Sequence, residues 1–270
     1  MPQTSLPPPQ DLAVPELPDV EVYRARLESA LVGRKLRKVD GGSAAEALPG
    51  RALASVNRRG KYVLLEFAGP GVLVLHLGPA GALSLGTTDG SPPAYLRLRL
   101  AFDDGQTLDF TDKRRLGQFH LVDSTAAFIA EKRLGPDALD PALDGAALVE
   151  RLSSRSAIKL ALTDQTRIAG IGNTYSDEIL FQARLHPALP TNSLSHAQAT
   201  ALLRVIRRVL KISIARDPTA EGFRARLPRG YLLPQRHAGG HCPRCGTELE
   251  QLRLPGHAAT FCPKCQALPG

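Results

Sequence analysis

The sequence has no long hydrophobic run and no recognisable export signal. No apolar stretch in its 270 residues approaches the roughly 18 residues that mark a membrane-spanning helix. The N-terminus also lacks the charged segment followed by an apolar one that is typical of a secretory signal. These absences exclude a membrane-spanning protein, and we expect a cytoplasmic protein with no membrane partner. A glycine-rich phosphate-binding loop is missing too, so we expect no nucleotide cofactor.

Cysteine is scarce, and its placement is informative. The four cysteines form two C-x-x-C pairs near the C-terminus, with 16 residues between the pairs. Two such turns can place four thiolates around one point, the ligand set of a structural zinc ion. A disulfide or redox pair is the alternative, but a cytoplasmic chain with two matched pairs and no other cysteine favours zinc. We predict a β-hairpin zinc finger that holds one structural Zn²⁺ through Cys242, Cys245, Cys262 and Cys265.

Positive charge is concentrated at the C-terminal end. The formal net charge is +8, yet residues 1–200 hold 22 basic and 22 acidic residues, while residues 201–270 hold 12 basic and 4 acidic ones. The whole surplus therefore lies in the last quarter of the chain. Such a concentration favours a polyanionic partner, nucleic acid first. A basic face that only improves solubility is the alternative.

The N-terminal half has the pattern of one helix followed by short strands. Residues 1–13 are rich in proline and are expected to be disordered. A helix is predicted from an N-cap at Asp19 to Gly33, because apolar residues recur there at helical spacing. Several short strands separated by turn signals follow between Lys35 and Val122, which predicts an antiparallel sandwich or barrel. The strongest strands are 61–67, 72–77 and 95–102.

Residues 156–187 have the pattern of a helix, a tight turn and a second helix. Apolar residues recur from Ile158 to Ile168, the two glycines of GIGN break the pattern, and Asn173 or Thr174 caps the next helix. The unpaired N–H groups at a helix start bind anions. Lys159 and Asn173 are therefore candidates to face one phosphate, although an ordinary helical hairpin has the same pattern.

A long helix is predicted from Ser193 or Ser195 through Ile214. Its apolar face is broad, and four basic residues follow one side at i, i+3, i+4 and i+7: Arg204, Arg207, Arg208 and Lys211. This stripe is either a nucleic-acid contact or the solvated side of a core helix. Residues 216–241 have the composition of a loop rich in Arg, Gly and Pro.

Together these patterns predict an α+β multidomain protein. An N-terminal antiparallel β-sandwich with an N-terminal helix is followed by a helical helix–two-turn–helix domain and a C-terminal β-hairpin zinc finger. We place the boundaries at 1–14 for an N-terminal extension that is disordered or non-native, 15–135 for the sandwich, 136–235 for the helical domain and 236–270 for the finger.

The combination of PELPDVE, GIGN and the terminal cysteine pairs resembles the formamidopyrimidine-DNA glycosylase/endonuclease VIII family. The resemblance runs from Pro15 to Gln266 and implies a base-excision-repair enzyme that acts on damaged double-stranded DNA as a glycosylase and AP lyase. It implies that a free N-terminal proline, here Pro15, attacks C1′ of the deoxyribose and forms an imine, while Glu16 acts as the acid.

The resemblance also assigns the remaining site residues. Lys61 matches a lysine of the sandwich domain that contacts the lesion or its phosphate, and Arg114 matches an arginine that enters the space of the flipped-out base. Lys159 and Asn173 match phosphate contacts of the helical hairpin. The candidate catalytic set is Pro15, Glu16, Lys61 and His257, and the candidate DNA-binding set is Arg114, Lys159 and Asn173.

The sequence departs from the family pattern at several places. Pro15 is internal, and an amide nitrogen is not a nucleophile, so we hypothesise that Val14 is a GUG start codon whose initiator Met is removed. His257 stands where the finger arginine is usual. Pro79 replaces the methionine of an LGMSG turn, Leu116 replaces the phenylalanine of RRFG, and QRHAGG replaces the YGR element before the finger.

Two other functions compete with the enzyme. One is a noncatalytic damaged-DNA-binding relative, which the internal Pro15 and the altered His257 position favour. The other is a zinc-dependent RNA-binding protein, because a basic helix and a finger do not distinguish nucleic acids. For the enzyme we expect a monomer in the cytoplasm, associated with the nucleoid. The sequence does not select between oxidised purines and oxidised pyrimidines.

Overall fold

The computed structural model describes residues 14–41 and 47–268, and these form two compact units. Unit 1 extends to Lys132 and includes the short segment Asp217–Glu221. Unit 2 contains the rest, so the helical hairpin and the cysteine-rich hairpin belong to the same unit. The predicted disorder of residues 1–13 concerns a segment outside the described residues.

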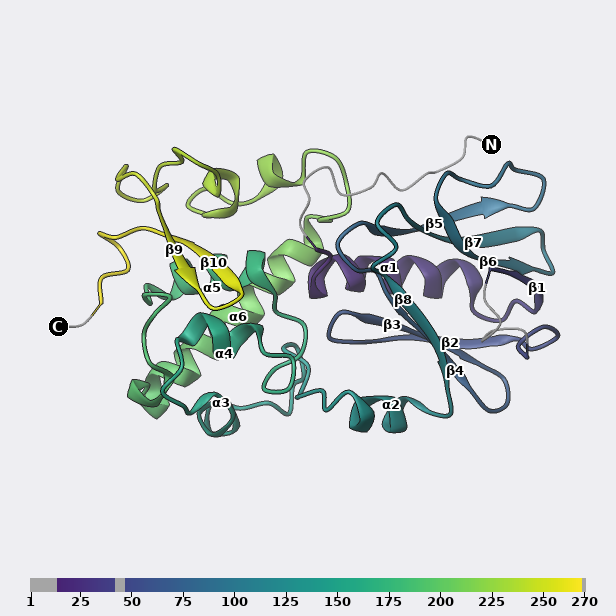
Figure 1. The fold of residues 1–270 in the computed structure, drawn as a ribbon, viewed down its shortest axis with the longest axis horizontal. Coiled ribbons are helices and arrows are strands. Elements are labelled where there is room, and N and C mark those ends of the chain that lie inside the picture. Colours follow the sequence, from purple (N-terminus) through teal and green to yellow (C-terminus); the bar gives the residue numbers. More distant parts are fainter. Residues whose placement is uncertain (1–13, 42–46, 269–270) are drawn as a thin grey trace. The chain divides into compact units, whose positions relative to one another are not determined.

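Unit 1 is built on two four-stranded antiparallel sheets, which confirms the predicted sandwich (Figure 1). One sheet has the strand order β1-β6-β7-β5 and the other β2-β3-β4-β8. Their bounds are β1 Leu36–Asp40, β2 Leu53–Arg59, β3 Tyr62–Phe67, β4 Val72–His76, β5 Gly81–Thr87, β6 Leu96–Phe102, β7 Gln106–Asp112 and β8 Gln118–Val122. Side chains alternate along a strand, so each sheet turns one apolar face inward.

Helix α1 (Leu17–Leu31) shares the hydrophobic core of the sandwich. Tyr23 of the helix is buried in one cluster with Leu65 of β3 and Phe110 of β7. The predicted start at Asp19 is wrong, because the helix begins at Leu17 with Glu16 as its N-cap. Both acidic side chains suit a helix start, and Asp19 takes the third helical position, from which it accepts the Glu16 N–H.

Two shorter segments complete unit 1. Helix α2 (Thr125–Glu131) has Ser124 as its N-cap and buries Phe128, whose ring meets Tyr62 edge-on at 5.0 Å between centroids. Segment 217–221 is fastened to α1 by Arg26, whose guanidinium donates to Asp217 Oδ2 at 2.5 Å and to Thr219 Oγ1 at 3.0 Å.

Unit 2 contains four α-helices among its described residues: α3 Gly145–Leu152, α4 Ile158–Thr163, α5 Asn173–Ala183 and α6 His196–Ala215. Short 3₁₀ helices lie at η2 Thr191–Ser193, η3 Phe223–Arg226 and η4 Leu233–Gln235. The hairpin predicted over 156–187 is present as α4, a turn and α5.

The first helix of this hairpin is shorter than predicted. Helix α4 ends at Thr163, although the apolar spacing continues to Ile168. Asp164 stops it, because its Oδ1 accepts the backbone N–H of Thr166 at 2.9 Å and the Thr166 hydroxyl at 2.7 Å. Gln165 then holds the turn through its side chain, which donates to the Ile171 carbonyl at 2.8 Å.

Helix α6 confirms the predicted long helix, with Ser195 and Gln198 forming a capping box at its start. The basic stripe is divided. Arg207 donates to the carbonyl oxygens of Asp140 and Leu143, both at 2.6 Å, and so holds the segment before α3. The other members of the stripe are exposed: Arg204, Arg208 and Lys211.

Strands β9 (Glu250–Leu254) and β10 (His257–Phe261) form the predicted antiparallel hairpin. Pro255 and Gly256 make the two-residue turn between them, and Gly256 has φ +70°, a conformation that suits glycine. Among the described residues no helix is both long and apolar enough to cross a membrane.

Candidate functional site

The start of α1 fixes the Glu16 carboxyl group beside Pro15. Both residues are buried, and Glu16 is only 2% exposed. The Glu16 N–H donates to Asp19 Oδ2 at 2.9 Å, and the Glu16 side chain accepts the N–H of Asp19. The carboxyl group of Glu16 therefore lies at the positive end of the helix dipole, one residue from the Pro15 nitrogen.

Asp19 is a second carboxyl group at this helix start, and sequence reasoning treated it only as a cap. Desolvation by burial raises the pKa of Asp19 to about 7, and the neighbouring Glu16 charge adds to the rise, while the hydrogen bond from the Glu16 N–H opposes it. Because its carboxyl group changes charge near neutral pH, the electrostatic surroundings of Glu16 change over the same range.

Lys61 lies at the tip of the β2–β3 hairpin. Gly60 and Lys61 form the two-residue turn between paired Arg59 and Tyr62, and Gly60 has φ +57°. The Lys61 ammonium is close enough to Asp19 to lower the pKa of that carboxyl group. The sandwich thus brings Lys61 and the start of α1 to one place.

His76 belongs to the same place and was missed by the sequence analysis. It lies opposite Tyr62 in the β3–β4 ladder, with ring centroids 4.9 Å apart. Burial and, to a smaller extent, the charge of Lys61 lower the pKa of His76. The only signal in the sequence was one titratable residue at the end of an apolar strand, which is too common to single out.

Arg114 extends from a turn that a buried carboxylate shapes. Asp112 is 1% exposed, and its Oδ1 accepts the N–H of Arg114 at 2.9 Å while its Oδ2 accepts the N–H of Gly117 at 2.6 Å. The three basic residues of the turn, Lys113 to Arg115, are exposed. This turn therefore presents a rigid group of positive charges to solvent.

Lys159 is placed differently from the exposed phosphate contact that the sequence suggested. Its side chain is fully buried, and Nζ donates to the Asn173 carbonyl at 3.0 Å, to Ser176 Oγ at 3.1 Å and to Asp177 Oδ1 at 2.5 Å. An ammonium group has three N–H donors. In this conformation all three have partners within the hairpin, and none is left for a phosphate.

Asp177 connects the helical hairpin to the cysteine-rich hairpin. Its second oxygen, Oδ2, accepts from Arg236 Nε at 2.8 Å and from the N–H of Thr260 on β10 at 3.2 Å. The carboxylate is 1% exposed. One buried charge therefore joins α4, α5, the chain after η4, and strand β10.

Asn173 is the first residue of α5, whereas the sequence predicted it or Thr174 as the cap. Gly172 takes the cap position with an extended backbone and no side-chain cap. Asn173 is half-buried, and no described residue forms a hydrogen bond with its Oδ1.

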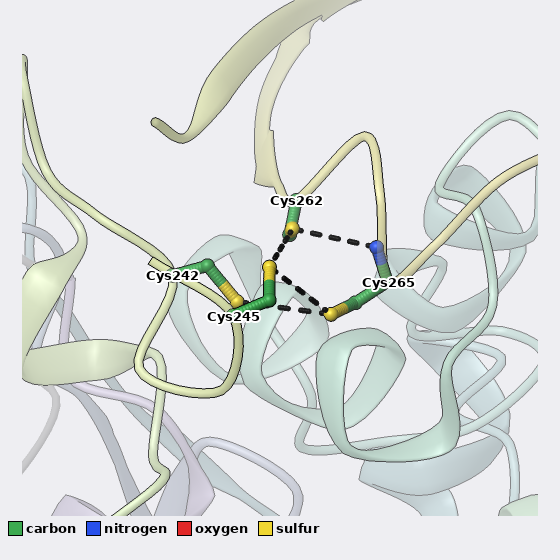
Figure 2. A group of neighbouring side chains, drawn as sticks. All are labelled: Cys242, Cys245, Cys262 and Cys265. Carbon is green, nitrogen blue, oxygen red and sulfur yellow. Dashed lines mark hydrogen bonds between the residues drawn. The ribbon is translucent and has the colours of Figure 1, made fainter. Parts of the chain in front are cut away.

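The sulfur atoms of the four cysteines converge between the two C-x-x-C turns (Figure 2). All four sulfur atoms lie within 4.8 Å of one another. The Cys245 sulfur is 3.6 Å from those of Cys262 and Cys265, and the Cys242 sulfur is 3.8 Å from that of Cys265. A tetrahedron with Zn–S bonds of about 2.3 Å has S–S edges of about 3.8 Å. The cluster fits zinc and leaves no open ligand position.

His257 begins β10 at the tip of the finger hairpin. It is half-buried, and its Nδ1 lies 3.3 Å from the Pro255 carbonyl oxygen. A neutral histidine can donate one hydrogen bond to a phosphate, but it lacks the planar fork of arginine. Its role at the site stays a prediction.

Glu178 gives unit 2 a pH-dependent stability. It is fully buried, and it accepts from Gln182 Nε2 at 2.7 Å and from the Leu233 N–H at 2.8 Å. Burial raises the pKa of Glu178 from 4.5 to about 7. Between these pH values the folded state holds a proton that the unfolded state has lost, so the free energy of unfolding falls as pH rises through this window.

Glu178→Gln is expected to remove this pH dependence, because glutamine does not ionise, although its NH₂ group cannot accept one of the two hydrogen bonds that Glu178 accepts. The free energy of unfolding of the variant should improve relative to wild type by up to about 3 kcal/mol between pH 4.5 and pH 7. Urea unfolding at a series of pH values measures this difference, with the exposed Glu150→Gln as the control. Parallel pH profiles for wild type and Glu178→Gln would contradict the assignment.

The fold and the site define a two-part nucleic-acid-binding protein of the helix–two-turn–helix class. A sandwich with a buried Pro–Glu helix start is joined in one chain to a helical hairpin and a four-cysteine finger. Known families match in the same order: the N-terminal domain of formamidopyrimidine-DNA glycosylase over residues 14–119, its H2TH domain over 134–224, and the zinc finger found in FPG and IleRS over 239–268.

Individual proteins give the same result. The formamidopyrimidine-DNA glycosylase of Thermomicrobium roseum is 37% identical over 94% of this chain and 100% of its own, and that of Symbiobacterium thermophilum is 36% identical over 95% and 90%. The structure of Lactococcus lactis Fpg with DNA that contains N7-benzyl-Fapy-dG aligns with a TM-score of 0.84, at 28% identity over 94% of this chain and 100% of that one. The chain belongs to the formamidopyrimidine-DNA glycosylase family, which confirms the resemblance, and its cysteine cluster is a structural zinc site.

Proposed function

We propose that this protein is a bifunctional DNA glycosylase and AP lyase of base-excision repair, which removes oxidised or ring-opened bases from double-stranded DNA. The observation that carries the proposal is the buried Pro15–Glu16 start of α1 in a chain that matches its relatives almost from end to end. A protein that only binds DNA would not require a Pro–Glu pair at this position. A covalent reaction, in contrast, needs an amine beside an acid.

The reaction follows from the chemistry of these two groups. The free secondary amine of Pro15 attacks C1′ of the deoxyribose, and the base leaves with the electron pair of the glycosidic bond and takes up the proton that the proline nitrogen loses. Glu16 gives a proton to the ring oxygen as the sugar opens, so that C1′ and the proline nitrogen form an iminium ion. Loss of a proton from C2′ then eliminates the 3′ phosphate, and hydrolysis of the imine frees the enzyme. Zinc supplies only the folding of the finger.

A free Pro15 requires that translation starts at Val14 and that the initiator residue is removed. One observation supports this part of the proposal: the match to the N-terminal domain of the family begins at residue 14.

The remaining site residues are proposed to hold DNA rather than to react. The exposed Arg114 turn supplies positive charge in unit 1, and Lys61 lies beside the reactive end of α1 with His76 near Lys61. In unit 2 we propose that Asn173, the first residue of α5, contacts a phosphate at the positive end of the helix dipole. We propose that buried Lys159 acts indirectly, by positioning the Asn173 backbone through the 3.0 Å hydrogen bond to its carbonyl.

A noncatalytic damaged-DNA-binding protein is the second candidate, favoured by His257 in place of an arginine. Duplexes with formamidopyrimidine, 8-oxoguanine, oxidised-pyrimidine or abasic sites distinguish the two when borohydride is added. Strand cleavage together with a reduced covalent adduct supports the enzyme. Tight binding with neither product on any duplex supports the binder. The proposed place of action is the cytoplasm, at the nucleoid, with the protein as a monomer.

A further inference from the structure

Two large hydrophobic side chains are unusually exposed on one part of unit 1. Tyr95 is 58% exposed and Leu116 is 52% exposed, the highest values among the large hydrophobic residues that the structure describes. Tyr95 directly precedes β6, and Leu116 lies in the turn between β7 and β8. Neither the sandwich core nor the proposed chemistry at Pro15 accounts for them.

Contacts show that the two residues belong to one surface. The Tyr95 carbonyl accepts the N–H of Asp112 at 3.0 Å, and Lys113 Nζ lies 5.6 Å from the Tyr95 ring centroid. The turn that contains Pro79 lies against the same loop, since a Cβ on Gly78 would come within 2.7 Å of the Gly117 nitrogen. We call Tyr95 and the turn Lys113–Leu116 the aromatic rim.

The backbone of the aromatic rim is strained in two places. Tyr95 has φ +61° and Arg115 has φ +56°, the left-handed region that bulky residues rarely adopt. Buried Asp112 holds the turn in this form through its bonds to the N–H groups of Arg114 and Gly117. Strain of this kind persists where the surrounding structure enforces it, and it clusters at ligand-binding sites.

The charge on the rim indicates the ligand. Lys113, Arg114 and Arg115 are exposed, and no hydrogen bond from their side chains to another described residue is present. An exposed aromatic ring beside exposed cations is the arrangement that stacks on bases while it neutralises phosphates. The turn itself offers no ring, because its exposed hydrophobic residue is Leu116.

We propose that Tyr95 stacks on a base of the duplex next to the lesion. This inference rests on the proposed function and adds a DNA-contacting residue to it. Extrusion of the damaged base costs stacking energy, and stacking of an aromatic side chain on a neighbouring base restores part of it. Tyr95 is a positioning residue, since it does not touch the reacting atoms.

The test uses the protein with its native N-terminus and a duplex that holds 2-aminopurine beside a tetrahydrofuran abasic analogue, which the protein cannot cleave. Tyr95→Ala is expected to bind this duplex about 5- to 100-fold more weakly and to lose part of the 2-aminopurine fluorescence change. Tyr95→Phe keeps the ring and should stay within about twofold of wild type. Val32→Ala, at another exposed hydrophobic residue, is the matched control and should change neither quantity.

A second variant separates stacking from folding. Asn tolerates the left-handed conformation better than Tyr does, so Tyr95→Asn should keep or raise the melting temperature while it weakens binding. If Tyr95→Ala binds as wild type does, or if binding and melting temperature fall together in both variants, the inference is overturned while the proposed function stands. If wild type itself neither binds nor cleaves damaged duplexes, the proposed function fails and the inference fails with it.

Discussion

Protein that begins at Pro15 is expected to form a borohydride-reduced adduct with a damaged duplex, whereas protein that keeps residues 1–14 is expected to form none. The physical reason is the state of one nitrogen. In a peptide bond the lone pair of the Pro15 nitrogen is delocalised into the carbonyl of Val14, but a free secondary amine is a nucleophile. Gel separation of reduced protein–DNA products measures the difference.

The carboxyl group of Glu16 is expected to contribute almost as strongly. Glu16→Gln keeps a side chain that can accept the Asp19 N–H, yet it removes the acidic proton. Loss of a positioned general acid lowers rates by roughly 100- to 10,000-fold. Single-turnover strand cleavage by protein that begins at Pro15 measures this loss, with exposed Glu150→Gln as the control. Equal rates for Glu16→Gln and wild type would exclude Glu16 as the acid.

A large loss of stability is expected when Asp177 is replaced. Asp177→Asn leaves the buried Lys159 ammonium without its counter-charge and weakens the contacts with Arg236 and Thr260. Breaking a buried ion pair by removing one partner costs about 3 to 5 kcal/mol. Urea unfolding should report a loss of this size, while exposed Asp89→Asn should change stability little.

A double variant shows whether the pair itself is responsible. Lys159→Met removes the charge that Asp177→Asn leaves unpaired, so the double variant should recover part of the lost stability. If the double variant loses as much stability as the two single variants together, the side chains of Lys159 and Asp177 are not energetically coupled. The Asp177→Asn variant should also retain zinc more weakly, because Asp177 accepts a hydrogen bond from the backbone of β10.

Local signals in the sequence were sufficient where neighbouring residues decide the structure. The cysteine pairs of the finger and the start of α6 at Ser195 each depend on a few adjacent residues. Both were predicted close to their observed positions. The same holds for the sandwich, because alternation along several strands requires buried faces on both sheets.

The sequence was insufficient where partners come from elsewhere in the chain. The sequence predicts that Lys159 faces a phosphate, and only the fold shows that Asp177 lies 2.5 Å from its ammonium group. Helix α4 ends early because the Asp164 side chain accepts a hydrogen bond from the backbone N–H of Thr166. This hydrogen bond competes with those that would continue the helix. His76 could be recognised as part of the site only from the fold, which places it near Lys61 in the β2–β3 turn.

The site of covalent attachment is the most direct test of the central claim. The reduced adduct formed on an abasic duplex is digested with a protease and nuclease, and tandem mass spectrometry locates the sugar remnant. A peptide that begins with modified Pro15 is the predicted result. A remnant on Lys61 or another lysine, or an adduct-free protein whose native chain begins ahead of Pro15, would contradict the account.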